Sequence, residues 1–155
     1  MRRYFAALIF ASVLLLSACS YTSNFVVLNE TEQPLRVQYK VKNSPSEPLQ
    51  MTGAPAKTAG ANLSNRDKQW QILKSGEYQL DREARTITVD VMPHEALRIL
   101  YITNYGGHDD DSDANKFAVN EIIIKGAAGE AKYQGEQIRR QFIEVSESLY
   151  VLMYK

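Results

Sequence analysis

The 155-residue sequence contains one cysteine, one tryptophan and two histidines, and these scarcities exclude several kinds of site. A single cysteine, Cys19, excludes an internal disulfide and any site built from paired cysteines. The two histidines, His94 and His108, lack the paired spacing of a zinc site. Basic and acidic residues number 18 each, so no excess of positive charge indicates nucleic-acid binding.

Signatures of nucleophilic catalysis are also missing. The sequence has no Gly-x-Ser-x-Gly turn and no Ser-x-x-Lys motif in a helical context, and its one cysteine lies near the amino terminus. We therefore expect a protein that is not an enzyme. A small hydrolase with an unrecognised site, for example a pair of carboxylates, is the third of the functions we consider.

The longest apolar run is too short to span a membrane. It extends from Phe5 to Leu16 behind the positive Arg2 and Arg3. A helix of about twelve residues reaches roughly 18 Å, against a hydrocarbon core of roughly 30 Å. A positive start, a short apolar run and small residues after it are typical of a secretory signal peptide. The sequence therefore predicts an exported protein.

The end of this run, Leu16-Ser17-Ala18-Cys19, resembles the lipobox of bacterial lipoproteins. The resemblance implies transfer of diacylglyceryl to the Cys19 sulfur, cleavage before Cys19, and acylation of the new amino group. Two or three acyl chains hold a protein stably on a membrane. In the Gram-negative sorting rule of this family, aspartate after the cysteine retains the protein in the inner membrane. Because Ser20 follows Cys19, the resemblance implies the periplasmic face of the outer membrane.

These patterns divide the chain into a signal peptide over residues 1–18, a short tether over 19–23, and one domain over 24–155. Cleavage removes Arg2 and Arg3, so the mature chain carries a net charge of about −2. The tether spans at most about 14 Å at 3.3–3.6 Å per residue. We expect a domain held close to its membrane by the lipid on Cys19.

Short segments of strand-like pattern dominate the domain. Residues 35–42 and 85–91 alternate between apolar and polar side chains, which is typical of strands with one buried face. Residues 24–29, 97–103 and 149–154 are apolar on both faces or nearly so. Two further strands are predicted over residues 117–125 and 130–133, joined by a hairpin at Gly126-Ala127-Ala128-Gly129.

The predicted fold is mainly β, a single antiparallel β-sandwich of seven or eight strands, immunoglobulin-like or transthyretin-like. A small closed barrel is the alternative. One short helix is expected near residues 136–142, because Ile138, Phe142 and Val145 recur at helical spacing. The long polar segment from Asn43 to Lys68 is expected to be a loop, either with one edge strand at 49–52 or without it, and is a candidate partner-binding loop.

A cluster of acidic residues within 108–115 is the candidate metal site. Asp109, Asp111, Asp113 and Asn115 match positions 1, 3, 5 and 7 of a calcium-binding loop. The match fails further on, because Ala114 stands where glycine is needed and Asn120 stands where a bidentate glutamate is needed. A looser Ca²⁺ site and a solvated connecting loop both remain open.

These observations favour a non-catalytic lipoprotein of the cell envelope. Its sandwich is expected to act as a binding or assembly module near the membrane surface, with an envelope protein as partner and no required cofactor. The alternative is a module that binds a divalent metal or a small ligand through the acidic loop. An exposed apolar patch or an unpaired edge strand would favour the first function.

Overall fold

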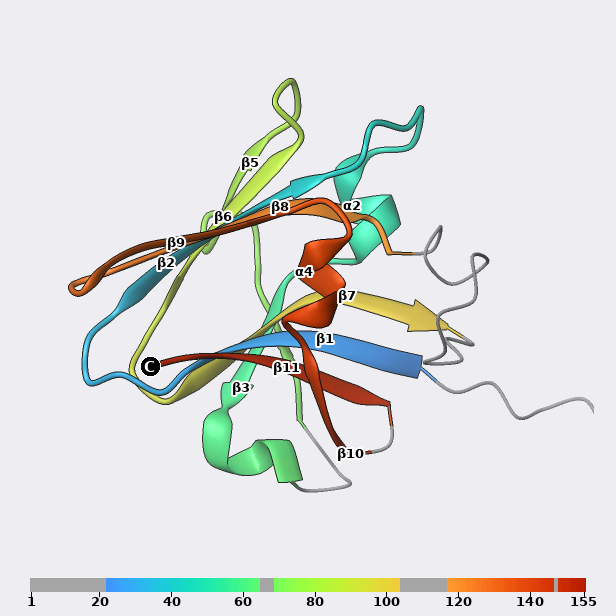
Figure 1. Cartoon of the computed structure of the whole chain (residues 1–155). Coiled ribbons are helices and arrows are strands. Elements are labelled where there is room, and N and C mark those ends of the chain that lie inside the picture. The colour runs from blue at the N-terminus through green and yellow to red at the C-terminus, as the bar shows by residue number, and fades with distance from the viewer. Residues whose placement is uncertain (1–21, 65–68, 104–116, 147) are drawn as a thin grey trace, which may run out of the picture.

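The computed structural model describes residues 22–64, 69–103, 117–146 and 148–155. Within these residues the chain forms two β-sheets that enclose a shared hydrophobic core (Figure 1). Sheet A has six strands in the order β10-β11-β1-β7-β3-β4, and sheet B has five in the order β5-β6-β2-β8-β9. The chain is mainly β, as the sequence predicted.

The strand bounds show which segments build each sheet. Sheet A contains β1 (Thr22–Asn29), β3 (Ala56–Ala59), β4 (Gln71–Ile72), β7 (Glu95–Thr103), β10 (Ile143–Ser146) and β11 (Leu149–Tyr154). Sheet B contains β2 (Leu35–Val41), β5 (Gln79–Asp81), β6 (Thr86–Val91), β8 (Val119–Gly126) and β9 (Gly129–Gln134). The seven predicted strands are all present, and β3, β4, β5 and β10 are additional. Among the described residues no helix is long and apolar enough to span a membrane.

The core between the sheets follows the alternation seen in the sequence. On β2, Leu35, Val37, Tyr39 and Val41 are buried while Arg36 is exposed. The inward side chains of β6 are Ile87, Val89 and Val91, as expected from the pattern. Sheet A contributes residues of three strands to the same cluster: Phe25 and Val27 of β1, Leu97, Ile99, Leu100 and Ile102 of β7, and Leu152 of β11. The period-two alternation therefore predicted correctly which side chains of β2 and β6 point into the core.

One pair of strands differs from the expected antiparallel arrangement. β11 lies parallel to β1, with Asn24 opposite Leu149 and Asn29 opposite Tyr154, whereas the other strand pairs described are antiparallel. The reason is the connection. β11 forms a hairpin with β10, and this hairpin places its second strand along the free edge of β1. A strand's apolar pattern carries no information on the direction of its neighbour.

The segment from Asn43 to Lys68 is not the structureless loop that was expected. Its described part contains helix α2 (Pro48–Thr52), strand β3 and the 3₁₀ helix η1 (Gly60–Ser64). The expected edge strand at residues 49–52 is a helix instead, because Pro48 occupies the first helical turn, where its missing N–H costs nothing. Arg85 fixes the start of the segment by donating to the carbonyl oxygens of Lys42, Ser44 and Ser46 at 2.9–3.1 Å.

The predicted helix near residue 138 is present but shorter than expected. Helix α4 covers Gln137–Arg140 and buries Ile138, and the chain then enters strand β10. Val145, predicted on the helix with Ile138 and Phe142, lies in β10 and is 49% exposed. The segment with this apolar spacing forms one helical turn followed by a strand. The prediction that Val145 lies on the helix was therefore wrong.

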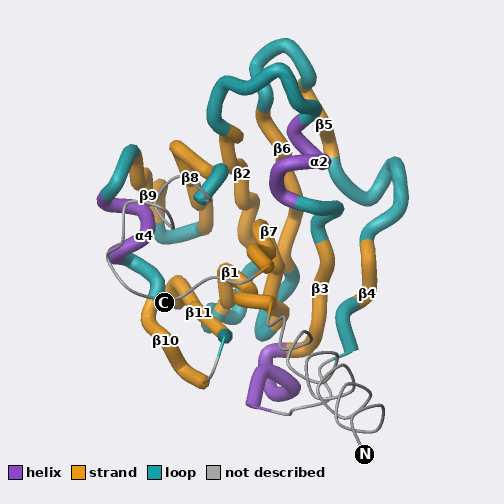
Figure 2. Tube along the Cα trace, turned by 90° about the vertical axis from the view of Figure 1, so that its right-hand side faces the viewer, coloured by secondary structure: helices purple, strands orange, loops and turns teal. Residues whose placement is uncertain are grey.

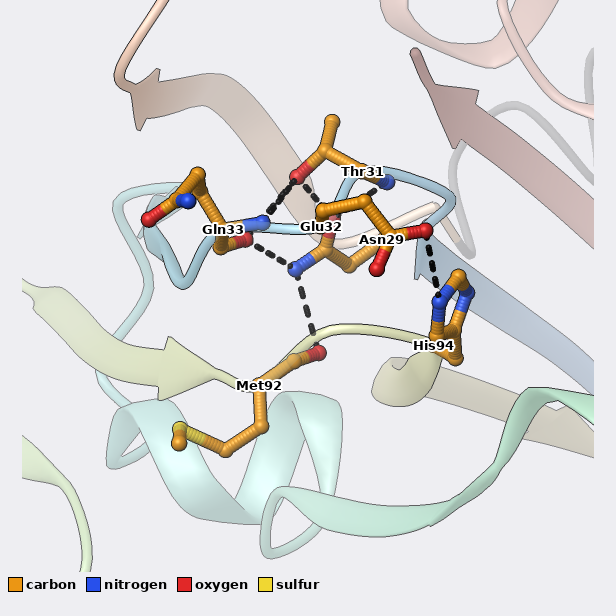
Figure 3. A network of polar contacts seen from close by, with 6 residues as sticks. All are labelled: Asn29, Thr31, Glu32, Gln33, Met92 and His94. Atoms are coloured by element: carbon orange, nitrogen blue, oxygen red, sulfur yellow. Dashed lines mark hydrogen bonds and ion pairs between the residues drawn. The ribbon is translucent and has the colours of Figure 1, made fainter.

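Asn29 joins the end of β1 to two connections (Figure 3). Its side chain is fully buried, and its Nδ2 donates to the carbonyl oxygens of Gln33 at 2.8 Å, Met92 at 3.0 Å and Val91 at 3.2 Å. Its Oδ1 accepts from both the backbone N–H and the hydroxyl of Thr31. Both the NH₂ group and the carbonyl oxygen of the buried Asn29 side chain therefore have hydrogen-bond partners.

Replacing Asn29 with alanine is expected to destabilise the domain by about 1–3 kcal/mol, because buried carbonyl groups lose their donor. Chemical denaturation of the two proteins measures the difference in the free energy of unfolding. Gln33→Ala is the matched control, since the network uses only the backbone of Gln33. Equal stability of Asn29→Ala and the control would contradict this account of the network.

Tyr39 differs from Asn29 in its hydrogen bonding. Its side chain is fully buried, and among the described residues its hydroxyl has no hydrogen-bond partner. Burial raises the pKa of the Tyr39 hydroxyl far above its ordinary value. Tyr39→Phe removes an unpaired polar group and is expected to stabilise the domain by about 1 kcal/mol, measured by thermal or chemical unfolding. Tyr133 is half-buried on the edge strand β9, and Tyr133→Phe is expected to change stability by less than about 0.5 kcal/mol. Destabilisation by Tyr39→Phe would show that the hydroxyl is hydrogen-bonded.

Candidate functional site: the outer face of sheet A

The outer faces of the two sheets differ in chemistry. The outer face of sheet B carries paired charges: Arg36 Nε lies 2.8 Å from Asp90 Oδ1, and Lys132 Nζ lies 3.0 Å from Glu121 Oε2. The hydrogen bond from Arg36 lowers the pKa of Asp90, so this carboxylate is charged at neutral pH. The outer face of sheet A instead carries a second cluster of apolar side chains, separate from the shared core.

Strand register shows how this second cluster is built. Residues that are partners across neighbouring strands point to the same side of a sheet. One row crosses all six strands from β4 to β10, and its members are Ile72, Ala56, Arg98, Val26, Val151 and Ile143. The next row consists of Thr58, Ala96, Leu28 and Met153. We call the outward side formed by these two rows, with Tyr101 and Val145, the apolar face. Its central members Ala56, Val26, Ala96 and Val151 are buried, so the face is exposed mainly at its margins.

Exposed apolar side chains gather on this face. Among the described residues, five large hydrophobic side chains are exposed, and four of them belong to the apolar face. These four are Ile72, Ile143, Val145 and Tyr101, with exposed fractions of 61%, 59%, 49% and 43%. Exposed apolar residues that occur singly need no explanation, whereas a contiguous group, such as Ile143 and Val145 on β10, indicates a binding surface.

A groove of about 320 Å³ opens on the same face, between η1 and the strands β10 and β11. It is lined by Leu28, Gly60, Ala61, Leu63, Val145, Ser146, Val151 and Met153. No charged side chain is among these lining residues. Figures 1 and 2 place η1 on the side of sheet A opposite sheet B, so this short helix forms one wall of the groove. The groove therefore favours an apolar occupant.

Gly60 is needed for η1 to approach the sheet. The N–H of Gly60 donates to the carbonyl oxygen of His94 at 2.7 Å. A β-carbon at position 60 would lie 2.8 Å from that same oxygen and 2.8 Å from the Leu28 side chain. Such distances require a shift of the backbone. This close contact holds η1 against β1 and against the connection between β6 and β7.

Arg98 supplies the positive charge of the face. Its guanidinium lies 5.2 Å from the ring centre of Trp70 and 5.2 Å from that of Tyr101. Its Nε is buried, and within the described residues it has no hydrogen-bond partner. Burial lowers the pKa of Arg98 below its ordinary value, yet a guanidinium remains charged at neutral pH. The apolar face therefore carries a cation that is held between two aromatic rings and has an unsatisfied donor.

The predicted binding loop contributes to this surface. From the segment Asn43 to Lys68, the structure places β3 within the face and η1 along the groove. Residues 65–68 lie outside the described part of the chain. The edge strand β10 was missed by the sequence analysis, because its short alternation of Ile143 and Val145 continues the helical spacing of the preceding turn.

The other candidate residues lie outside the described residues. Cys19 precedes the described part, and Asp109, Asp111, Asp113 and Asn115 fall within 104–116. Binding of Ca²⁺ at the acidic loop therefore stays a prediction. Within the described ranges no group of three or more histidine, cysteine, aspartate or glutamate side chains is placed to hold a metal ion.

No protein-family model matches the chain, and no curated protein or solved structure matches it. The geometry of the apolar face is thus the evidence from which a function is argued.

Proposed function

We propose that this protein is a non-catalytic lipoprotein, anchored by lipid on Cys19 to the periplasmic face of the outer membrane of a Gram-negative cell. Its two sheets form a β-sandwich of the immunoglobulin-like or transthyretin-like kind that acts as a binding or assembly module near the membrane. The observation that carries the proposal is the difference between the outer faces, since sheet A is apolar where sheet B is charged. The apolar face is the proposed binding surface.

The position of β1 links the anchor to this surface. β1 begins at Thr22 and lies between β7 and β11 in the interior of sheet A. Three residue steps separate Cys19 from Thr22, a reach of at most about 11 Å. An anchor at Cys19 therefore holds sheet A, more directly than sheet B, beside the membrane.

Burial of the exposed side chains would drive binding. Complete burial of an isoleucine or valine side chain contributes about 1.5–3 kcal/mol. Burying the exposed half of such a side chain on binding would therefore contribute about 1 kcal/mol. Ile72, Ile143 and Val145 provide three such contributions on one face.

Photo-crosslinking in intact envelopes tests this proposal. Benzoylphenylalanine at position 145 is expected to form adducts with an envelope component, either protein or lipid. The matched control places the same residue at position 79, because Gln79 is exposed on β5, an edge strand of sheet B. The Cys19→Ala variant is expected to lose the adducts at position 145. Equal adducts at positions 145 and 79, or adducts at neither, would contradict the proposal.

A further inference from the structure

We propose that the apolar face rests on the phospholipid surface of the membrane that carries the anchor, with Arg98 binding a lipid phosphate. This inference rests on the proposed function, because it takes the lipid on Cys19 as given. It goes further by assigning the component that the apolar face binds. A phospholipid surface is amphipathic, because its apolar acyl chains lie beneath a layer of negatively charged phosphates.

The distribution of the exposed side chains favours a broad surface over a narrow segment of a protein. Ile72 lies on β4 and Ile143 lies on β10, at opposite edges of sheet A. Five spacings of about 4.8 Å separate these strands, so the face is about 24 Å wide. A peptide added along β10 would contact Ile143 and Val145 but would not reach Ile72.

The aromatic and charged side chains of the face match the interfacial layer of a bilayer. Trp70 and Tyr101 have apolar rings with a polar end, and such residues are enriched at membrane–water interfaces. Arg98 lies between their rings with an unpartnered Nε. A guanidinium binds phosphate oxygens through parallel hydrogen bonds. Because the Arg98 Nε is buried, a lipid phosphate would meet the exposed part of this half-buried side chain.

The charge of the face complements the phosphate layer. In the two rows that define the apolar face, Arg98 is the charged member, and neither row contains a carboxylate. Glu144 pairs with Tyr150, whose ring stacks on the core residue Phe25, so Glu144 belongs to the opposite side of β10. The face would therefore approach phosphate groups without repulsion from its own carboxylates.

Docking by this face leaves the charged face of sheet B turned away from the membrane. The ion pairs Arg36–Asp90, Lys132–Glu121 and Lys125–Glu130 would then face water. Polar surfaces of this kind stay hydrated, so the two faces of the sandwich would have separate environments. A protein segment bound to the apolar face is the competing occupant, and the experiment distinguishes it.

The single tryptophan of the chain, Trp70, reports on docking. Full-length lipidated protein is reconstituted into vesicles of phosphatidylethanolamine and phosphatidylglycerol, with and without bromine on the acyl chains. We expect quenching of Trp70 emission by the brominated lipids and a blue shift on reconstitution. In the matched control, Trp70→Phe is combined with Gln79→Trp, which moves the fluorophore to sheet B, and we expect no quenching there. Absent quenching of Trp70, or equal quenching at the two positions, would overturn the inference.

A second pair of variants tests the role of Arg98. Arg98→Gln removes a positive charge from the apolar face, and Lys132→Gln removes one from sheet B. An arginine near an anionic surface contributes about 1 kcal/mol, so Arg98→Gln is expected to lower the docking equilibrium about fivefold, read as the brominated-to-unbrominated emission ratio. Lys132→Gln is expected to leave that ratio unchanged. Equal effects of the two variants, or no effect of Arg98→Gln, would overturn the phosphate contact.

The failures of the inference and of the proposed function are distinguishable. If Trp70 is unquenched while position 145 forms adducts with a protein, the apolar face binds a protein segment and only the inference falls. If the protein carries no lipid on Cys19, the proposed function itself falls.

Discussion

Replacing Cys19 with alanine is expected to abolish incorporation of lipid into the protein completely. The reason is chemical, because the sulfur of Cys19 is the only thiol sulfur in the chain that can accept diacylglyceryl. Cleavage before residue 19 is expected to fail in the same variant, since the resemblance implies that lipid transfer precedes it. Metabolic labelling with palmitate, together with the intact mass of the purified protein, measures both effects.

Ser20→Asp is the matched control for this experiment. It leaves Cys19 in place, so lipid incorporation is expected to stay at the level of the unaltered protein. The sorting rule of the resembled family instead predicts a change of location from the outer to the inner membrane, which density-gradient separation of the membranes detects. Labelling of the Cys19→Ala protein with palmitate would contradict the anchor.

Phe25→Ala is expected to destabilise the domain by about 3–5 kcal/mol, which is a large fraction of the stability of a small domain. Phe25 is fully buried, and its ring centre lies 4.9–5.4 Å from the ring centres of Tyr150, Phe117 and Phe142. These four residues lie on β1, on β11, just before β8, and between α4 and β10. Removing the central ring leaves a cavity that neighbours on several elements cannot fill together.

Urea denaturation of Phe25→Ala and of Val145→Ala separates core packing from surface exposure. Val145 is half exposed, and its truncation is expected to change the free energy of unfolding by less than about 0.5 kcal/mol. The account of the core would be wrong if the two variants lost similar stability.

The shared core could be predicted well from the sequence. On β2 and β6, apolar and polar side chains alternate with period two, and this pattern identified both the strands and their inward faces. The hairpin between β8 and β9 was also predicted, because its Gly-Ala-Ala-Gly turn joins two strand-like segments. These features depend on residues that are close together in the sequence, so a local pattern can predict them.

The apolar face could not be predicted because an apolar pattern does not tell what covers it. Residues 97–103 and 149–154 are apolar on both sides or nearly so, which leaves open whether the second side is covered. In a structure of two sheets each strand has one side that faces away from the shared core. Strands that are apolar on both sides therefore indicate an apolar outer face, to which β11 contributes Val151 and Met153 here.

The remaining differences come from contacts between distant parts of the chain. The short strand β3 is recognisable only through its pairing with β7, where Ala56 lies opposite Arg98. The parallel pairing of β1 and β11 joins the two ends of the domain. Likewise Trp70 lies outside β7, the strand that carries Arg98 and Tyr101, so its contact with Arg98 could not be predicted from spacing.

Cysteine accessibility in intact outer membranes tests the orientation of the apolar face most directly. The native thiol of Cys19 is expected to be blocked by lipid, so Val145→Cys and Gln79→Cys each provide one reactive thiol. With a membrane-impermeant maleimide after mild opening of the periplasm, we predict rapid labelling at position 79, and labelling at position 145 only after detergent is added. Equal labelling rates at the two positions in intact membranes would contradict the account.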